Sequence, residues 1–200
     1  MKIIEQSWKW IQKPHNPLQI IEKAGRTCYK SENRITDTSA QQFVKSLIKR
    51  KHESVIEHIS ASVKLITNLG VTHELVRHRL ASYSQESTRY VSYKKELVFI
   101  KPIWWDKWSD EERRIWLNTM KHIEQAYLSL LKSGSPPEKA REVLPKSLKT
   151  EIVVTANLRE WRHIFKLRCS PKAHPQIRAL MIDCLEEFKK EIPVVFDDII

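Results

Sequence analysis

The stretch that decides the fold is Thr72–Tyr90, THELVRHRLASYSQESTRY. Its first part, from Thr72 to Arg79, contains neither Gly nor Pro, and we predict a helix there. This part ends on three consecutive basic residues, Arg77, His78 and Arg79. At about 100° per residue, three successive side chains of a helix point in three directions. They suit a ligand with several anionic parts; the alternative is a basic helix end that is stabilised by its own dipole.

The second part of the stretch is rich in hydroxyl groups, and we predict a loop there. Ser82, Ser84 and Ser87 can offer neutral hydrogen-bond donors to oxyanions. Arg79 and Arg89 can each hold a phosphate by two parallel hydrogen bonds. Together the two parts indicate a site for a phosphorylated molecule.

Composition agrees with an anionic ligand. The chain has 200 residues and 41% hydrophobic residues, which is enough for one core, so we predict a single domain over residues 1–200. Its formal net charge of +11 favours nucleic acid, a membrane surface or phosphorylated small molecules as partners. With only three glycines, the sequence holds neither a Rossmann fingerprint nor a P-loop.

The cysteines and the hydropathy pattern bear on location. Cys28, Cys169 and Cys184 are odd in number and scattered, so we expect no disulfide framework, a reducing environment and a cytoplasmic protein. A thiol nucleophile at Cys169 is a minor alternative. No run of eighteen apolar residues occurs, and we expect no signal peptide and no membrane span.

Periodicity and capping residues predict both strands and helices along the chain. Strands are expected at 2–11, 59–68, 97–100 and 150–156, and helices at 17–28, from 36–39 to about 51, 109–132, 136–145, 157–168 and 175–190. Trp104, Trp105 and Trp108 could stack on a base, but such a cluster is more often part of the core.

The segment His52–His58, HESVIEH, permits a zinc interpretation. The helical metalloprotease pattern needs histidines four residues apart, whereas these lie six apart, roughly 240° around a helix. Spacing indicates no third ligand. A metalloenzyme at His52 and His58 is therefore one alternative, and a basic nucleic-acid-binding module, supported by charge and tryptophans, is another.

Four sequence blocks resemble those of flavin-dependent thymidylate synthases, in the order typical of that family. The most specific is Arg77-His78-Arg79 followed after seven residues by Ser87. The others are HESVIEH at 52–58, PPEKAREVLP at 136–145, and NLREWRHIFKLR at 157–168. Ser84, Gln85 and Glu74 depart from residues that are frequent in the family, which leaves their individual contacts open.

The resemblance implies a role for each matched position. Arg168, against the uracil ring, and Ser87 would be the catalytic residues. The flavin would be bound by Ser54, with His52 nearby, and by Arg77, His78, Arg79, Gln85, Asn157, Leu158, Arg159 and His163. The substrate dUMP would be bound by Glu74, Arg77, Gln85, Glu86, Ser87, Thr88, Arg89, Arg141 and Arg168.

The resemblance also implies the fold, the reaction and the assembly. The fold would be α+β, with a small, mostly antiparallel sheet flanked by long helices. The cofactor would be FAD, the carbon donor 5,10-methylenetetrahydrofolate and the reductant NADPH, and dUMP would be methylated to dTMP without a cysteine nucleophile. A homotetramer with sites shared between subunits is expected, and neither nucleic acid, membrane nor metal is expected as a partner. FAD, dUMP, 5,10-methylenetetrahydrofolate and NADPH are all anionic, which suits a chain with a net charge of +11.

Overall fold

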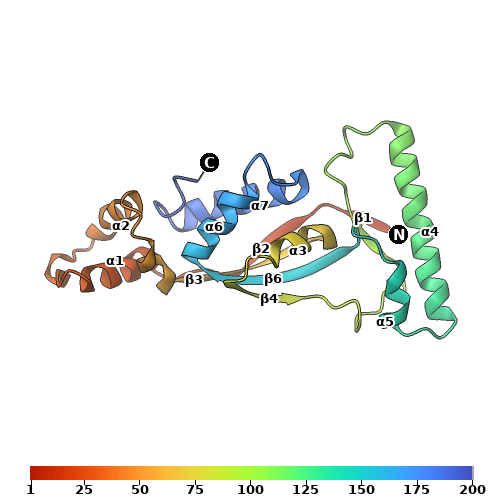
Figure 1. Cartoon of the computed structure of the whole chain (residues 1–200), viewed down its shortest axis with the longest axis horizontal. Helices are drawn as coiled ribbons and strands as arrows, with labels where there is room; N and C mark the ends of the chain where they lie inside the picture. The colour runs from red at the N-terminus through yellow and green to blue at the C-terminus, as the bar shows by residue number, and fades with distance from the viewer. Residues whose placement is uncertain (200) are drawn as a thin grey trace. The chain divides into compact units, whose positions relative to one another are not determined.

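The computed structural model describes residues 1–199 and has the predicted α+β architecture (Figure 1). Its contacts divide the chain into two compact units, each assembled from three segments. Unit 1 comprises Met1–Ser7, Leu65–Leu75 and Ser84–Ile152; unit 2 comprises Trp8–Lys64, Val76–Tyr83 and Val153–Ile200. The expected single-domain organisation stays a prediction. No helix within residues 1–199 is both long and apolar enough to cross a membrane.

The strands form two sheets. The larger has the order β2 (Ser7–Gln12), β3 (Ser60–Asn68), β6 (Lys149–Asn157), β4 (Ala81–Gln85). Leu158 N donates to Ile59 O over 2.9 Å, and Leu69 N donates to Leu148 O over 3.3 Å, a register that makes β3 and β6 antiparallel. The smaller sheet pairs β1 (Lys2–Ile4) with β5 (Val98–Ile100) in parallel.

Unit 2 buries the apolar face of two C-terminal helices. Its helices are α1 (Pro17–Thr27), the 3-10 helix η1 (Glu32–Arg34), α2 (Ser39–Lys49), the 3-10 helix η2 (Glu53–His58), α6 (Leu158–Arg168) and α7 (Pro175–Glu191). Figure 1 shows α6 and α7 together above the strands. Trp161 of α6 donates from Nε1 to Ala61 O over 3.0 Å, and the Phe165 and Phe188 rings lie 5.0 Å apart. Gly25 lets α1 approach α2, because a Cβ there would lie 2.8 Å from Phe43.

Unit 1 is built around one long helix. Its helices are α3 (Leu69–Leu75), α4 (Asp110–Lys132), α5 (Pro137–Ala140) and the 3-10 helix η3 (Arg141–Val143). Ser109 caps α4 as predicted, in a reciprocal capping box with Glu112. The unit's core is formed by Leu97, Phe99, Met120, Tyr127, Ala140 and Leu148.

The deciding stretch itself differs from the prediction at two points. The predicted helix over 72–79 ends at Leu75, so the three basic residues lie beyond α3. The predicted loop contains strand β4, over Ala81–Gln85, which pairs with β6 at the edge of the sheet. Pairing with β6 is a long-range interaction that the local pattern of serines does not reveal.

Three smaller predictions are also corrected. The opening strand is divided into β1 and β2 at residues 5–6. The helix predicted over 136–145 is α5 followed by the 3-10 turn η3. Along α4, Met120 and Tyr127 are buried while Ala126 is exposed. The tryptophans at 104–108 are at most partly buried, and Trp105 packs edge-on against Trp116 at 5.6 Å.

One buried cation ties three segments of unit 2 together. Arg162 of α6 is 1% exposed. Its guanidinium donates to both carboxylate oxygens of Asp198 over 2.6 and 2.7 Å, to Glu53 over 3.1 Å and to the Val195 carbonyl. The hydrogen bonds from Arg162 lower the pKa of Asp198 below its usual value of 3.8.

The ion pair between Arg162 and Asp198 should make the stability of the protein depend on pH. Because the folded pKa of Asp198 is lowered, its contribution is present above the unfolded pKa near 3.8 and is lost as pH falls through the lower folded value. At neutral pH, Asp198→Asn should lower the free energy of unfolding by about 1–2 kcal/mol, since Asp198 is half exposed. We expect the two proteins to converge in acid, measured by urea unfolding across pH. An unchanged gap between them at low pH would contradict this assignment.

Candidate active site

The start of α6 carries one group of predicted site residues. Asn157 ends β6 and caps the helix, because its Oδ1 accepts from Glu160 N over 2.9 Å. Arg159 and His163, four residues apart, share the exposed face. Leu158 is fully buried and its N–H pairs with β3, so its side chain belongs to the core.

Behind that face lies His78, which is 4% exposed. Arg168, at the end of α6, donates from Nε to His78 Nε2 over 3.0 Å. Glu160 Oε1 lies 3.6 Å from His78 Nδ1, and the His163 ring is 5.4 Å away in an edge-to-face arrangement. Desolvation, followed by the charges of Arg168 and His163, lowers the pKa of His78 from 6.5 to about 4. His78 is therefore neutral at physiological pH.

The hydrogen bond from Arg168 fixes the tautomer of His78. A neutral imidazole that accepts at Nε2 carries its proton on Nδ1, the atom facing Glu160. Tyr83 of β4 donates from its hydroxyl to the His78 carbonyl over 2.8 Å, and burial raises the pKa of Tyr83 to about 12. The backbone and ring of His78 are thus both held.

This cluster also has the composition of a metal site, but its hydrogen bonding argues against one. His78, Glu160 and His163 bring ligand atoms within 4.8 Å of one another, the only such group within residues 1–199. A metal-bound imidazole donates from its other nitrogen, whereas Nε2 here accepts from a cation, Arg168. His52 and His58 acquire no third ligand among the described residues, so the alternative metalloenzyme gains no support.

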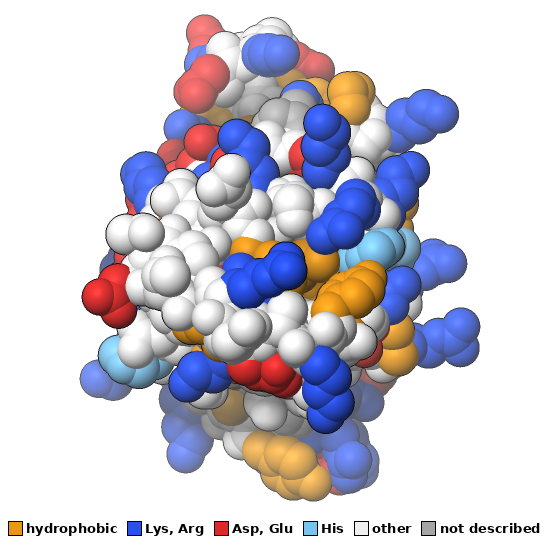
Figure 2. Space-filling view, turned by 90° about the vertical axis from the view of Figure 1, so that its left-hand side faces the viewer, with side chains coloured by type: hydrophobic (Ala, Val, Ile, Leu, Met, Phe, Trp, Pro, Cys, Tyr) orange, Lys and Arg blue, Asp and Glu red, His pale blue; other side chains and the backbone are white. Residues whose placement is uncertain are grey.

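Two exposed arginines are suited to an anionic group. Arg77 and Arg79 are exposed, and within residues 1–199 no carboxylate pairs with either. Arg159, by contrast, lies 2.5 Å from Glu57 and 3.9 Å from Glu53. Figure 2 shows Lys and Arg side chains spread around the end of the molecule that carries α1 and α2, with fewer acidic ones.

Unit 2 contains two cavities beside these residues. One, of about 740 Å³, is lined by Asn157, Arg159 and His163 together with Leu80 and Lys166. The other, of about 390 Å³, is lined by His52, Ser54 and Arg159 among others. The structure thus brings Ser54, Arg159, Asn157 and His163 to adjoining cavities through the shared Arg159. Three carboxylates, Glu53, Glu57 and Glu160, also line the larger cavity, and the first two pair with Arg159. A phosphate bound there would have to replace these carboxylates as the partner of Arg159.

A second group of predicted site residues lies in unit 1. Gln85, at the end of β4, donates from Nε2 to the hydroxyls of Thr72 and Thr150 over 3.1 and 3.3 Å. Ser87 opens a turn in which its hydroxyl accepts from Arg89 N over 3.3 Å. Gln85 therefore keeps its amide oxygen for a ligand, while the Ser87 hydroxyl keeps its proton to donate.

Glu86 is held by residues that the sequence patterns did not indicate. Tyr93 donates from its hydroxyl to Glu86 Oε1 over 2.6 Å, and Lys149 donates to Oε2 over 3.0 Å. Lys149 also lies 2.6 Å from Glu151, whose carbonyl accepts from Glu86 N over 2.8 Å. Both carboxylate oxygens of Glu86 are engaged, so this residue fixes the start of the Ser87 turn. Lys149 lies 63 residues away, and no local motif could have found it.

The remaining unit 1 residues are cationic or flank the turn. Arg89 is half exposed and reaches Glu138 at 3.9 Å, a weak contact for an exposed pair. Arg141 begins η3 and lies 3.7 Å from Glu142. Thr88 is partly buried within the turn, and Glu74 lies in the last turn of α3. Both arginines can exchange such contacts for a phosphate.

Two of the three cysteines are buried. Cys169 is fully buried, and desolvation raises the pKa of its thiol to about 12. Cys184 is also buried, with its pKa raised by the same cause. Cys28 is exposed, and within residues 1–199 all three are free thiols. Burial and the raised pKa of its thiol give no support to the minor alternative of a nucleophile at Cys169.

Comparison with known proteins places this arrangement in a family. Residues 9–194 match the family described as "Thymidylate synthase complementing protein". The chain is 34% identical to a flavin-dependent thymidylate synthase of Geobacter sulfurreducens over 196 residues, covering 94% of this chain and 84% of that protein. It is 35% identical to one of Mycobacterium tuberculosis over 196 residues, covering 90% and 78%.

A solved structure has the same fold. The UMP/dUMP methylase PolB from Streptomyces cacaoi, bound with 5-Br dUMP, superposes with a TM-score of 0.85 at 22% identity. The alignment covers 98% of this chain and 96% of that one. The match over residues 9–194 and the identities above 30% confirm the resemblance seen in the four sequence blocks. This chain belongs to the family of flavin-dependent thymidylate synthases.

Proposed function

We propose that this protein methylates dUMP to dTMP, with FAD as cofactor, 5,10-methylenetetrahydrofolate as carbon donor and NADPH as reductant. The observation that carries the proposal is the hydrogen bond from Arg168 to a buried, neutral His78. It holds a permanent cation in a fixed direction beside the predicted flavin residues. Family membership supplies the reaction class.

The flavin is assigned to unit 2. Bound there, FAD would supply the hydride chemistry, and the protein would supply position and field. Asn157, Arg159 and His163 line the 740 Å³ cavity, while Arg77 and Arg79 lack carboxylate partners within residues 1–199. Arg77 and Arg79 can bind a diphosphate directly, whereas Arg159 would have to exchange Glu57 for it. Ser54, on η2, lines the neighbouring cavity.

The dUMP phosphate is assigned to the unit 1 residues. Ser87 and Arg89 share one turn, held at its base by Glu86. Arg141 supplies a further cation. The related PolB structure holds 5-Br dUMP, which supports a pyrimidine nucleotide as the ligand. We further propose a homotetramer in which subunits share each site.

Arg168 is assigned the main electrostatic role. A guanidinium stays charged at working pH, so it can stabilise negative charge on the uracil ring without a proton transfer of its own. This would favour ionisation at N3 and enrich electron density at C5. His78, as a neutral acceptor, directs Nε of Arg168 without adding a negative charge at that atom.

A direct test uses the purified protein. It should be yellow, release FAD on denaturation, and form dTMP from dUMP, methylenetetrahydrofolate and NADPH. A protein that neither carries nor binds added FAD, and that does not respond to dUMP, would reject the proposal.

Replacing Arg168 tests the chemical step. Arg168→Ala should keep FAD but lose dTMP formation by about a hundredfold or more, the usual effect of removing one electrostatic stabiliser. Arg168→Lys should restore only part, because Lys lacks the planar fork. The measurement is single-turnover dTMP formation from the reduced enzyme at saturating dUMP. A near-normal rate in Arg168→Ala would show that this arginine is a bystander.

The same variant tests the neutral His78. Loss of the Arg168 charge should raise the pKa of His78 above about 4, though not to 6.5, because desolvation remains its main cause. The pKa is read from NMR titration of the imidazole protons in the apo-protein. Cys28→Ser, remote from the ring in sequence and exposed, serves as control and should leave the pKa unchanged. Equal pKa values in wild type and Arg168→Ala would contradict the assigned contact.

Two further variants test the flavin site. His163→Ala and Arg79→Ala remove exposed side chains, so we expect normal folding but FAD binding weakened at least about tenfold, a loss of about 1.4 kcal/mol. Flavin content is measured by absorbance after purification, and folding by circular dichroism. Lys121→Ala, which replaces an exposed side chain of α4, is the matched control. Full flavin content in both test variants would refute their role.

A further inference from the structure

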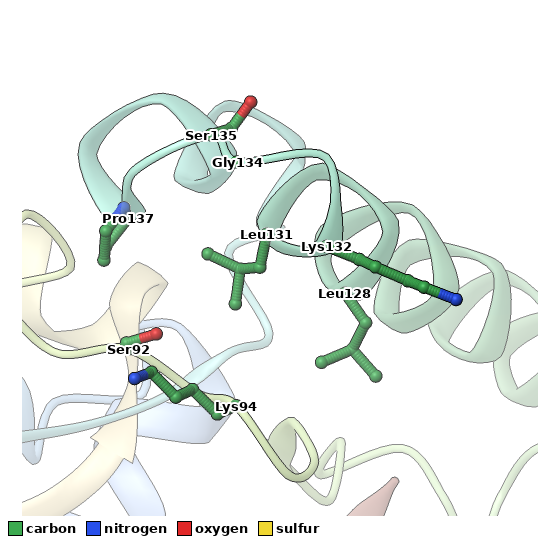
Figure 3. Close-up of a pocket in the computed structure, with 8 residues that line it drawn as sticks. All are labelled: Ser92, Lys94, Leu128, Leu131, Lys132, Gly134, Ser135 and Pro137. Carbon is green, nitrogen blue, oxygen red and sulfur yellow. The ribbon is translucent and has the colours of Figure 1, made fainter.

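Unit 1 contains a cavity that the proposed reaction does not use. Its volume is about 620 Å³, within the range of roughly 300–1,000 Å³ that small-molecule sites occupy. The cavity lies against the end of α4, the start of α5 and the segment from Ser92 to Lys94 (Figure 3). None of its lining residues is among those predicted to bind flavin or dUMP.

One part of the cavity is apolar. Leu128 and Leu131 project from α4 into it, and Pro137 lies across from them (Figure 3). Both leucines pack on one side against the buried core of unit 1 yet are only partly buried. Their remaining apolar surface is available to a ligand, which would remove it from water.

The polar groups of the cavity are all donors suited to an anion. Ser92, Lys94, Lys132 and Ser135 contribute two hydroxyls and two ammonium groups. Within residues 1–199, no hydrogen bond or ion pair engages any of these four side-chain groups. In Figure 3, Lys94 lies beside Ser92 on one wall, while the stem of Lys132 runs along α4. The long stem of Lys132 can bring its ammonium to the rim.

The wall that carries Ser135 is fixed by the end of α4. Gly134 adopts φ +91°, and its N–H donates to Leu131 O over 3.1 Å while Ser135 N–H donates to Leu130 O over 3.0 Å. These two bonds form a Schellman closure, which favours glycine at the left-handed position. The backbone of this wall is therefore held in place, while the Ser135 hydroxyl points away from Lys94 and Ser92 (Figure 3).

We propose that this cavity binds a small molecule with an apolar, ring-sized body and one anionic group. Leu128, Leu131 and Pro137 would cover the body. Lys94 and Ser92, which lie side by side, would bind the carboxylate, sulfonate or phosphate. The site does not depend on the proposed reaction, because it shares no residue with the assigned flavin and dUMP sites.

Isothermal titration calorimetry with anilinonaphthalene sulfonate tests the proposal on the full chain. The titration is run with saturating FAD and dUMP, and again without them, so that binding of the probe in empty nucleotide sites cannot account for the signal. We expect one saturable site per chain in both. Sulfate alone and neutral N-phenylnaphthylamine should each bind at least about tenfold more weakly, because each lacks one half of the ligand.

Variants locate the probe. Leu131→Glu and Lys94→Glu should each weaken binding at least about tenfold, and Lys132→Glu should weaken it in the same direction. Lys121→Glu, a charge reversal on α4 outside the cavity, is the matched control and should bind as wild type. Lys94 and Lys132 are exposed, so their variants remain informative if Leu131→Glu fails to fold. Absence of saturable binding, or wild-type affinity in both lysine variants, would overturn the proposal.

Turnover is not a readout in this test. A protein that lacked thymidylate synthesis could still bind the probe, and an active enzyme could fail to bind it. The two proposals therefore fail separately.

Discussion

Burial of the Arg162 guanidinium is the constraint on which the geometry of unit 2 depends. Removing a cation from water costs several kcal/mol unless it is paired and hydrogen-bonded, so its partners have to be held in place. They are Asp198 and Val195 near the C-terminus and Glu53 at the start of η2. Because these groups bind the buried guanidinium of Arg162, they hold η2 and the C-terminal segment against α6. Because Ser54 follows Glu53 directly, the same charge orients a predicted flavin contact.

The basic residues of α6 have different environments, because they lie at different angles around the helix axis. Arg159 and His163 face outward at a cavity, Arg162 points into the protein, and Arg168 ends the helix against His78. The sequence alone does not tell which of these cations face solvent. The structure distinguishes these residues, because Arg162 is 1% exposed and held by carboxylates whereas Arg168 is bonded to an imidazole.

Elements specified by local chemistry could be predicted from the sequence. Ser109 and Glu112 form a capping box at the start of α4, and Asn157 caps α6 where the apolar strand ends. The end of α3 and strand β4 could not be predicted, because they follow from pairing across the sheet, as in the bond from Glu86 N to Glu151 O. The same holds for the site. The arginines of the site were identified from the family motifs. Tyr93 and Lys149, which hydrogen-bond to Glu86, belong to no local sequence pattern.

The charges around His78 explain how the contact between Arg168 and this buried imidazole remains stable at neutral pH. Glu160, 3.6 Å from Nδ1, favours a protonated ring, but desolvation and two neighbouring basic groups outweigh it and lower the pKa to about 4. The neutral ring leaves a lone pair on Nε2 to accept from Arg168. Protonation would turn that acceptor into a donor facing a donor, so the contact exists only because the imidazole stays neutral. Burial of His78 thus serves the placement of Arg168 as well as the core.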